Sequence, residues 1–274
     1  MEGVYGGLGS FTFDSQMAAS HVRITGVAGT VLTGGATTLF AIVRGAPKIE
    51  LISLTFEQSG ASAVIALSEA HVGRRQLGGS SSFAASAGQG PELYMENCTF
   101  LHNSGSALLL NAGTIRIKAS AFSDNGSPAV QGGGAIRAIH GHLFIDGSAF
   151  RRNVAWNGGA IHADGAVEGW VMNCIFSNNS AVNLGGAINL EGGDFVVGNQ
   201  TNIYGNRAAA GRSLYLSINA SASYVLPAPA GHWIANTIRC TRATEQTSQG
   251  CRPQLSDRSL FDMLPGPLND GQCL

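Results

Sequence analysis

Two carboxylates recur at the same place in a repeated phrase. Asp164 and Glu191 each lie six residues after the start of a Gly-Gly-Ala-Ile sequence. Stacked on neighbouring repeats, they could bind a hard cation or act as the acid and base of glycoside cleavage. Asp146 and Asp194 are candidates to join them from a neighbouring strand. The preceding repeat has Ile139 at this offset, so the simpler interpretation is a pair of solvated acids.

Histidines gather near the same part of the chain. His140, His142 and His162 are expected near one corner of consecutive repeats, where Asp164 could complete a metal or proton-transfer site. Single histidines on turns are usually surface residues. We therefore predict no metal site and no cofactor.

Two phrases define the units that must position these side chains. A hydrophobic residue followed by Asn after two positions occurs five times, and the Asn returns at steps of 22, 28, 26 and 27 residues. Gly-Gly-Ala-Ile begins at residues 133, 158 and 185, after each of three such phrases. The hydrophobic-Asn pairs are Phe100 and Asn103, Phe122 and Asn125, Phe150 and Asn153, Phe176 and Asn179, and Ile203 and Asn206. A period of this length is typical of a solenoid.

Short β-prone runs between the phrases predict about three strands per unit, hence an all-β, right-handed parallel β-helix of about eight coils. Equivalent residues of stacked strands lie about 4.8 Å apart, so the Phe residues should form an inward column. The Asn residues should form an amide ladder at a corner, with left-handed backbone angles. The glycines should serve the next bend through positive φ or a missing Cβ.

Earlier residues repeat this pattern faintly. Residues 49–56 and 63–67 resemble residues 92–100 and 107–110. Phe56 precedes Phe100 by 44 residues, which predicts one intervening coil. The Gly- and Ser-rich stretch 78–90 should be a loop at a corner.

The composition changes near residue 226. Five of the eight prolines and three of the five cysteines follow it, so we predict a β-helix over residues 1–226 and a Pro- and Cys-bearing tail over 227–274. Cys240 and Cys251 are candidates for a disulfide, which leaves Cys273 to pair outside this chain; three free thiols are the alternative. Cys98 and Cys174 should be buried, unbridged small residues.

The phrase pairs resemble the repeats of chlamydial polymorphic outer membrane proteins and, more broadly, the pectin-lyase-like right-handed β-helix superfamily. The match runs from Phe122 to Ile136, Phe150 to Ile161 and Phe176 to Ile188, with weaker copies on both sides. The tail departs from that bacterial family and is similar to cysteine-rich segments in large predicted surface proteins of protists and algae. These resemblances imply an extracellular or cell-surface region tethered through parts outside this chain.

Composition narrows the function. A net charge of −1 with 12% charged residues argues against a nucleic-acid binder, and no run approaches the roughly 20 apolar residues of a membrane span. Residues 1–25 do not read as a signal peptide. We expect a non-enzymatic role in structure, adhesion or recognition of glycans or surface proteins. The alternative is a polysaccharide lyase or hydrolase that uses Asp164 and Glu191.

Two surface features complete the expectations. Asn-x-Ser/Thr patterns that would accept glycans begin at Asn97, Asn125, Asn178, Asn199 and Asn219. An aromatic row on a strand face would favour sugar binding, but the tryptophans, Trp156, Trp170 and Trp233, predict no such ladder.

Overall fold

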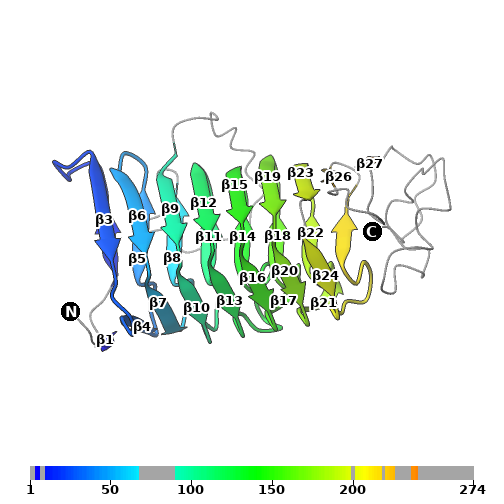
Figure 1. Cartoon of the computed structure of the whole chain (residues 1–274), viewed down its shortest axis with the longest axis horizontal. Coiled ribbons are helices and arrows are strands. Elements are labelled where there is room, and N and C mark those ends of the chain that lie inside the picture. The colour runs from blue at the N-terminus through cyan, green and yellow to red at the C-terminus, as the bar shows by residue number, and fades with distance from the viewer. Residues whose placement is uncertain are drawn as a thin grey trace.

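The computed structural model describes residues 4–6, 10–67, 90–198, 201–217, 220–225 and 236–239, and in this part the chain forms strands and turns without helices. It winds repeatedly through three parallel sheets, A, B and C, so that its coils stack along one axis (Figure 1). The predicted parallel β-helix is confirmed.

The strands of each sheet follow one another along this axis. Sheet A contains β1 (Val4–Gly6), β4 (Val31–Gly35), β7 (Thr55–Ser59), β10 (Thr99–Leu101), β13 (Ala121–Ser123), β16 (Ala149–Arg151), β20 (Ile175–Ser177) and β24 (Asn202–Tyr204). Sheet B contains β2 (Phe11–Phe13), β5 (Phe40–Val43), β8 (Val64–Leu67), β11 (Leu108–Leu110), β14 (Ile136–Ala138), β18 (Ile161–Ala163), β22 (Ile188–Leu190) and β25 (Leu214–Leu216). Sheet C contains β3 (His21–Thr25), β6 (Lys48–Ile52), β9 (Glu92–Glu96), β12 (Thr114–Lys118), β15 (Gly141–Asp146), β19 (Val167–Met172), β23 (Gly193–Gly198), β26 (Ala220–Val225) and β27 (Asn236–Arg239). A small fourth sheet pairs β17 (Val154–Asn157) with β21 (Ser180–Leu184).

Seven coils have one strand in each main sheet, from β3–β4–β5 to β23–β24–β25, which is close to the predicted eight. The faint early repeat is confirmed, because Ile49 pairs with Leu93 and Val64 with Leu108. The predicted intervening coil is wrong: Phe56 pairs directly with Phe100, so β7 and β10 belong to adjacent coils. The extra residues lie between β8 and β9, and most of them, 68–89, are outside the described residues.

The interior contains a column of stacked phenylalanines. Neighbouring rings from Phe56 to Phe176 have centroids 4.6–4.9 Å apart and planes within 9° of parallel. The column consists of Phe56, Phe100, Phe122, Phe150 and Phe176, all fully buried. Ile203 continues it on β24, where it pairs with Phe176 and is half-buried. The spacing is that of neighbouring strands, so one aromatic per coil fills the interior without gaps.

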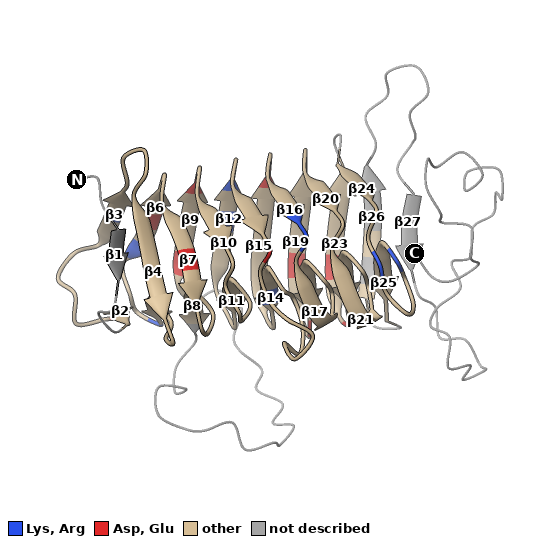
Figure 2. Ribbon diagram, turned by 90° about the horizontal axis from the view of Figure 1, so that it is seen from below, with Lys and Arg blue, Asp and Glu red and all other residues tan. Residues whose placement is uncertain are grey.

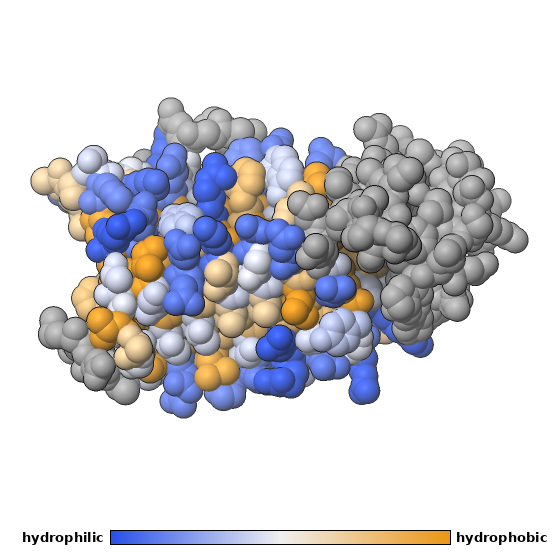
Figure 3. All heavy atoms as spheres, in the orientation of Figure 1, coloured by the Kyte–Doolittle hydropathy of each residue, from blue (hydrophilic) through white to orange (hydrophobic). Residues whose placement is uncertain are grey.

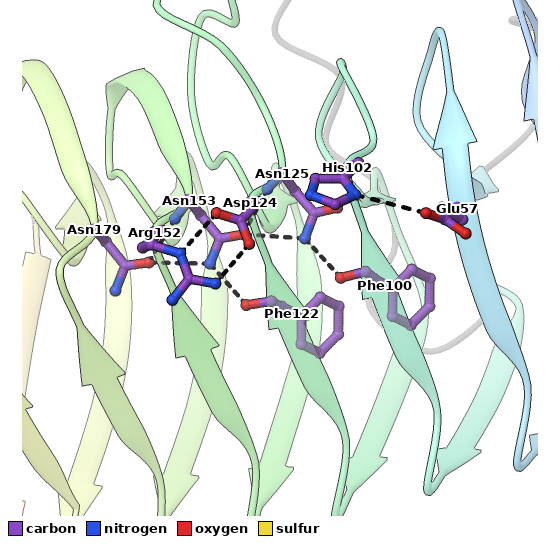
Figure 4. Close-up of polar contacts among 9 residues, drawn as sticks. All are labelled: Glu57, Phe100, His102, Phe122, Asp124, Asn125, Arg152, Asn153 and Asn179. Atoms are coloured by element: carbon purple, nitrogen blue, oxygen red, sulfur yellow. Dashed lines mark hydrogen bonds and ion pairs between the residues drawn. The ribbon is translucent and has the colours of Figure 1, made fainter.

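A ladder of asparagine side chains runs beside this column (Figure 4). Asn125 donates from Nδ2 to the Phe100 carbonyl and to Oδ1 of Asn153, at 3.0 Å each. Its own Oδ1 accepts from the backbone N and Nδ2 of Asn103. The same pattern continues through Asn179 to Asn206. Each buried amide is therefore satisfied by its neighbours, and the coils are hydrogen-bonded through their side chains as well as their strands.

The expected left-handed backbone of these asparagines is wrong. The positive φ belongs to the residue just before each of them: His102, Asp124, Arg152 and Asn178, at 52–56°, and Gly205, at 67°. This preceding residue makes the bend and faces outward, while the Asn that follows points into the corner. Asp124 and Arg152 use this outward position for a surface ion pair at 2.8 Å. Asn125 is fully buried, so it is not a glycan acceptor in the folded chain.

The paired glycines serve the next bend, as predicted. Gly133, Gly158 and Gly185 have φ between 58° and 64°. A Cβ on the second glycine of each pair would collide with backbone atoms of the following coil. Neither position of the pair therefore accommodates another residue without strain.

The cysteines in the described region are buried free thiols, Cys98 and Cys174, as expected. Burial raises the pKa of Cys98 to about 11 and that of Cys174 to about 12. Cys240, Cys251 and Cys273 lie outside the described residues, so the disulfide stays a prediction. In the predicted tail, β27 pairs antiparallel with β26 and extends sheet C. The domain boundary near residue 226 likewise stays a prediction.

Candidate functional site

The corner between sheets B and C brings the two predicted carboxylates together. Asp164 follows β18 and Glu191 follows β22, and these strands are neighbours in sheet B. His162 projects from the middle of β18 toward the same place. One ligand atom from each of these three side chains lies within 4.8 Å of the other two. We call these three residues the corner cluster.

The other two carboxylates do not join them. Asp146 ends β15 and accepts a hydrogen bond from Asn173 at 2.6 Å. Asp194 is near the start of β23, and its register partner across sheet C is Glu168. Glu168 pairs with His142 on the neighbouring strand β15. His142 and Asp146 are four residues apart on that strand, so their positions are separated by roughly 13 Å. Asp146 and Asp194 therefore lie toward opposite ends of their strands, so the four candidate carboxylates do not all share one site.

The predicted trio of histidines is not assembled either. His142 is on sheet C, 3.3 Å from Glu168. His140 packs against Gly165, at the turn before β19. Among the described residues, His162 alone of the three shares a possible metal-binding group with Asp164.

His162 lies in an unusual environment for a histidine. It is only 3% exposed, and a Cβ on Gly132 would collide with its ring. Burial lowers the pKa of His162 below its usual value; Glu191 and Asp164 oppose this shift, and Arg137 adds to it. Neither ring nitrogen makes a hydrogen bond with good geometry: Nε2 lies 3.4 Å from Oε1 of Glu191, and the backbone of Asn157 is a second polar neighbour, which favours the protonated ring. Nε2, the nitrogen that faces Glu191, is therefore a potential ligand.

A second surface lies on the outer face of sheet C. The central outward residues of four successive strands form a row of Tyr94, Arg116, Phe144 and Trp170. The Phe144 and Trp170 rings stack at 4.8 Å, and the Arg116 guanidinium lies 4.1 Å from the Phe144 ring centroid. The expectation of no aromatic ladder is wrong, because this row combines three aromatic residue types and an arginine. In the sequence, only the alternation of inward and outward residues along the sheet C strands indicated this row. No residue type is repeated along it.

A shallow groove of about 370 Å³ follows this row. It is lined by Tyr94, Arg116, Ile117, Lys118, Phe144, Ile145, Asp146, Trp170 and Met172. Burial, and a hydrogen bond that the Tyr94 hydroxyl donates to Glu96, raise the pKa of Tyr94 to about 12. Because Phe144 and Trp170 cover one another's faces, mainly their edges remain for a partner. We call this surface the sheet C row.

Charge does not single out either surface. Lys, Arg, Asp and Glu are scattered along the coils in Figure 2. On the face shown in Figure 3, apolar and polar residues interrupt one another. The described residues therefore present surfaces of mixed charge and polarity.

One short segment of the chain matches the model of a known repeat family. Residues 173–191 match the Chlamydia polymorphic membrane protein repeat. This segment contains one copy of each repeated motif: Phe176 with Asn179, and the Gly-Gly-Ala-Ile sequence that begins at Gly185. It ends at Glu191. The chain thus resembles these repeats in sequence, and its β-helix is consistent with them. No curated protein and no solved structure matches the chain.

The matched repeat comes from membrane proteins by its description, which points to a surface-protein repeat region. The described part of the chain has no helix that is long and apolar enough to cross a membrane.

Proposed function

We propose that this chain is a non-enzymatic recognition region of a surface protein, and that it binds another protein through the sheet C row. The observation that carries the proposal is the groove along this row, with Tyr94, Arg116, Phe144, Trp170 and Met172 in its lining. Tyr, Trp, Phe, Met and Arg are the residue types enriched at protein interfaces, where a few such side chains supply most of the binding energy.

The row favours a protein over a glycan. A sugar ring stacks best on an exposed aromatic face, and here the rings of Phe144 and Trp170 face one another. Lys118 and Asp146, at the rim, are both exposed and supply charges of opposite sign. A mixed rim around an aromatic centre suits a complementary protein surface.

A binding assay on intact cells tests this proposal. Labelled full-length chain is added to a panel of cells before and after treatment with a broad protease or with glycosidases. We expect protease, and not glycosidase, to abolish binding. Binding lost only after glycosidase would identify a glycan ligand instead, and no binding to any cell would contradict the proposal.

Matched tryptophan variants locate the surface. Trp170→Ala removes the end of the row, while Trp156→Ala removes a 48% exposed tryptophan on β17, away from sheet C. We expect Trp170→Ala to weaken binding at least tenfold and Trp156→Ala to leave it unchanged. Equal binding by both variants would exclude the sheet C row as the contact surface.

The polysaccharide-cleaving alternative retains a single observation, the proximity of Asp164 and Glu191 within the corner cluster. A digestion screen with plant, algal and bacterial polysaccharides, with and without Ca²⁺, tests it. Cleavage that disappears in the Asp164→Asn/Glu191→Gln variant would establish an enzyme. We expect no cleavage, because Asp146 lies at the other end of the sheet C strands and Asp194 is not part of the corner cluster.

A further inference from the structure

We propose that the corner cluster, His162, Asp164 and Glu191, binds a divalent transition-metal ion of the Zn²⁺ class. The site would join two adjacent coils at the corner between sheets B and C. This inference is independent of the recognition function proposed above, because it uses different residues on a different part of the surface.

The first argument is the unused imidazole of His162. A buried polar group without a hydrogen bond costs about 1–3 kcal/mol, so such groups are rare in folded proteins. Here Nε2 is buried, makes no hydrogen bond of good geometry and lies 3.4 Å from a carboxylate oxygen of Glu191. A metal ion between Nε2 and the carboxylates would satisfy the nitrogen that faces the cluster.

The second argument is the distance between donor atoms. Zn²⁺ bonds to nitrogen and oxygen are about 2.1 Å long, so two ligands of a tetrahedral ion lie about 3.4 Å apart, against about 3.0 Å for an octahedral ion. His162 Nε2 and Glu191 Oε1 are 3.4 Å apart. This is long for a hydrogen bond and fits two ligands of one tetrahedral centre.

The third argument is that the structure holds Glu191 in place. Asn189, fully buried on β22, donates from Nδ2 to Oε1 of Glu191 at 3.0 Å. Ser217 donates from its hydroxyl to the Glu191 carbonyl at 2.7 Å. Hydrogen bonds of this kind to a ligand orient it and reduce the entropy lost on binding a metal.

Charge favours a cation despite one opposing group. Asp164 and Glu191 supply two negative charges close to the neutral imidazole. Arg137, the register neighbour of His162 on β14, is close enough to lower the pKa of His162 and also opposes a cation. The two carboxylates outnumber this one positive group.

The donor set selects the class of ion. One imidazole and two carboxylates suit Zn²⁺ and Co²⁺, whereas Ca²⁺ takes six to eight oxygen ligands. Three protein ligands leave a position open for water or for a group of a bound partner. Glu191 is 36% exposed, so the ion could reach the cluster from solvent.

Cobalt titration of the full chain tests this site. Thiols are alkylated first, because the chain has five cysteines that could compete for the metal. Co²⁺ is then added while visible absorption is recorded, and Zn²⁺ affinity is measured by competition with a chelator. We expect one equivalent of Co²⁺ with the intense absorption of tetrahedral coordination, displaced by Zn²⁺ and unaffected by Ca²⁺.

Three substitutions and a matched control assign the ligands. Glu191→Gln, Asp164→Asn and His162→Gln should each weaken Zn²⁺ binding at least tenfold. The control is His142→Gln, which removes the histidine of a more exposed His–Glu pair on adjacent coils of sheet C, at a similar 3.3 Å. We expect its titration to overlay that of the parent.

Several outcomes would overturn the site. They are the absence of a tight equivalent, binding of Ca²⁺ in place of Co²⁺, or identical titrations for the parent and Glu191→Gln. Because Glu191 and Asp164 are not buried, their variants keep the proposal testable even if His162→Gln fails to fold. Circular dichroism of each metal-free variant shows whether it has folded like the parent chain.

Discussion

The asparagine ladder and the corner cluster occupy two corners of the same coils, but their chemistry differs. In the ladder, one residue type recurs on five coils, and each interior amide is hydrogen-bonded to the next. In the corner cluster, the equivalent residues differ from coil to coil, and Nε2 of the buried His162 makes no hydrogen bond of good geometry.

This difference separates structural residues from candidates for function. A residue repeated on every coil can satisfy its hydrogen bonds with its own copies, so repetition by itself is evidence for a structural role. A buried polar group that breaks the repeat must find a different partner or remain unsatisfied. The departures from the repeat, rather than the repeat itself, are where a ligand is expected.

The strongest test of the structural side is removal of a central ring. Phe150→Ala should lower the free energy of unfolding by about 3–5 kcal/mol, because it leaves a cavity between two stacked neighbours. Chemical denaturation measures the change. Phe11→Ala, at a 55% exposed ring, is the control and should cost much less. Equal midpoints for parent and Phe150→Ala would contradict the interior column.

Interrupting the ladder should be the next largest effect. Asn153→Ala removes two donated and two accepted hydrogen bonds, and leaves the Phe122 carbonyl without its side-chain donor. We expect a loss of about 2–4 kcal/mol. Asn183→Ala, at an asparagine outside the ladder, serves as the comparison. If both substitutions cost the same in urea denaturation, the ladder makes no special contribution.

The pH dependence of stability probes the corner cluster. His162 has a lowered pKa in the folded chain, so the unfolded chain binds a proton first as the pH falls. The free energy of unfolding should therefore decrease below about pH 6.5, down to the folded pKa. Metal-free urea denaturation at pH 7.5 and 5.5 measures this decrease. It should be smaller in His162→Gln, and a variant with the full decrease would show that another group is responsible.

The smallest effect is expected at the surface beside the ladder. Arg152 lowers the pKa of Asp124 through a bidentate hydrogen bond, but both side chains are solvent-accessible. Exposed ion pairs contribute little to stability, and salt screens them. Asp124→Asn should leave the denaturation midpoint almost unchanged at high salt. A large shift of the denaturation midpoint would mean that the Asp124–Arg152 pair, and not the ladder alone, stabilises this corner.

The sequence predicted the structure correctly where neighbouring coils have the same residue at equivalent positions. The Phe and Gly motifs predicted the coil, its stacking and the glycine bends. The prediction failed at the backbone of the ladder, because the spacing identifies a corner without identifying which residue makes the bend. His102 and Asp124 take the positive φ there. Their residue types tolerate it, but so does the Asn beside each of them, so residue type alone does not choose between the two.

The amino-acid sequence by itself determined the β-helix, because a repeat of about one coil brings identical side chains within about 4.8 Å and makes each unit a template for the next. Only the tertiary structure decided that Phe56 and Phe100 are neighbours across 44 residues, since an insertion at a corner does not change the stacking. It also decided that Tyr94, Arg116, Phe144 and Trp170 form one row, and that His162 meets Glu191. These groups combine different residue types from different coils, so their proximity depends on the register between strands. No repeated sequence motif indicates that register.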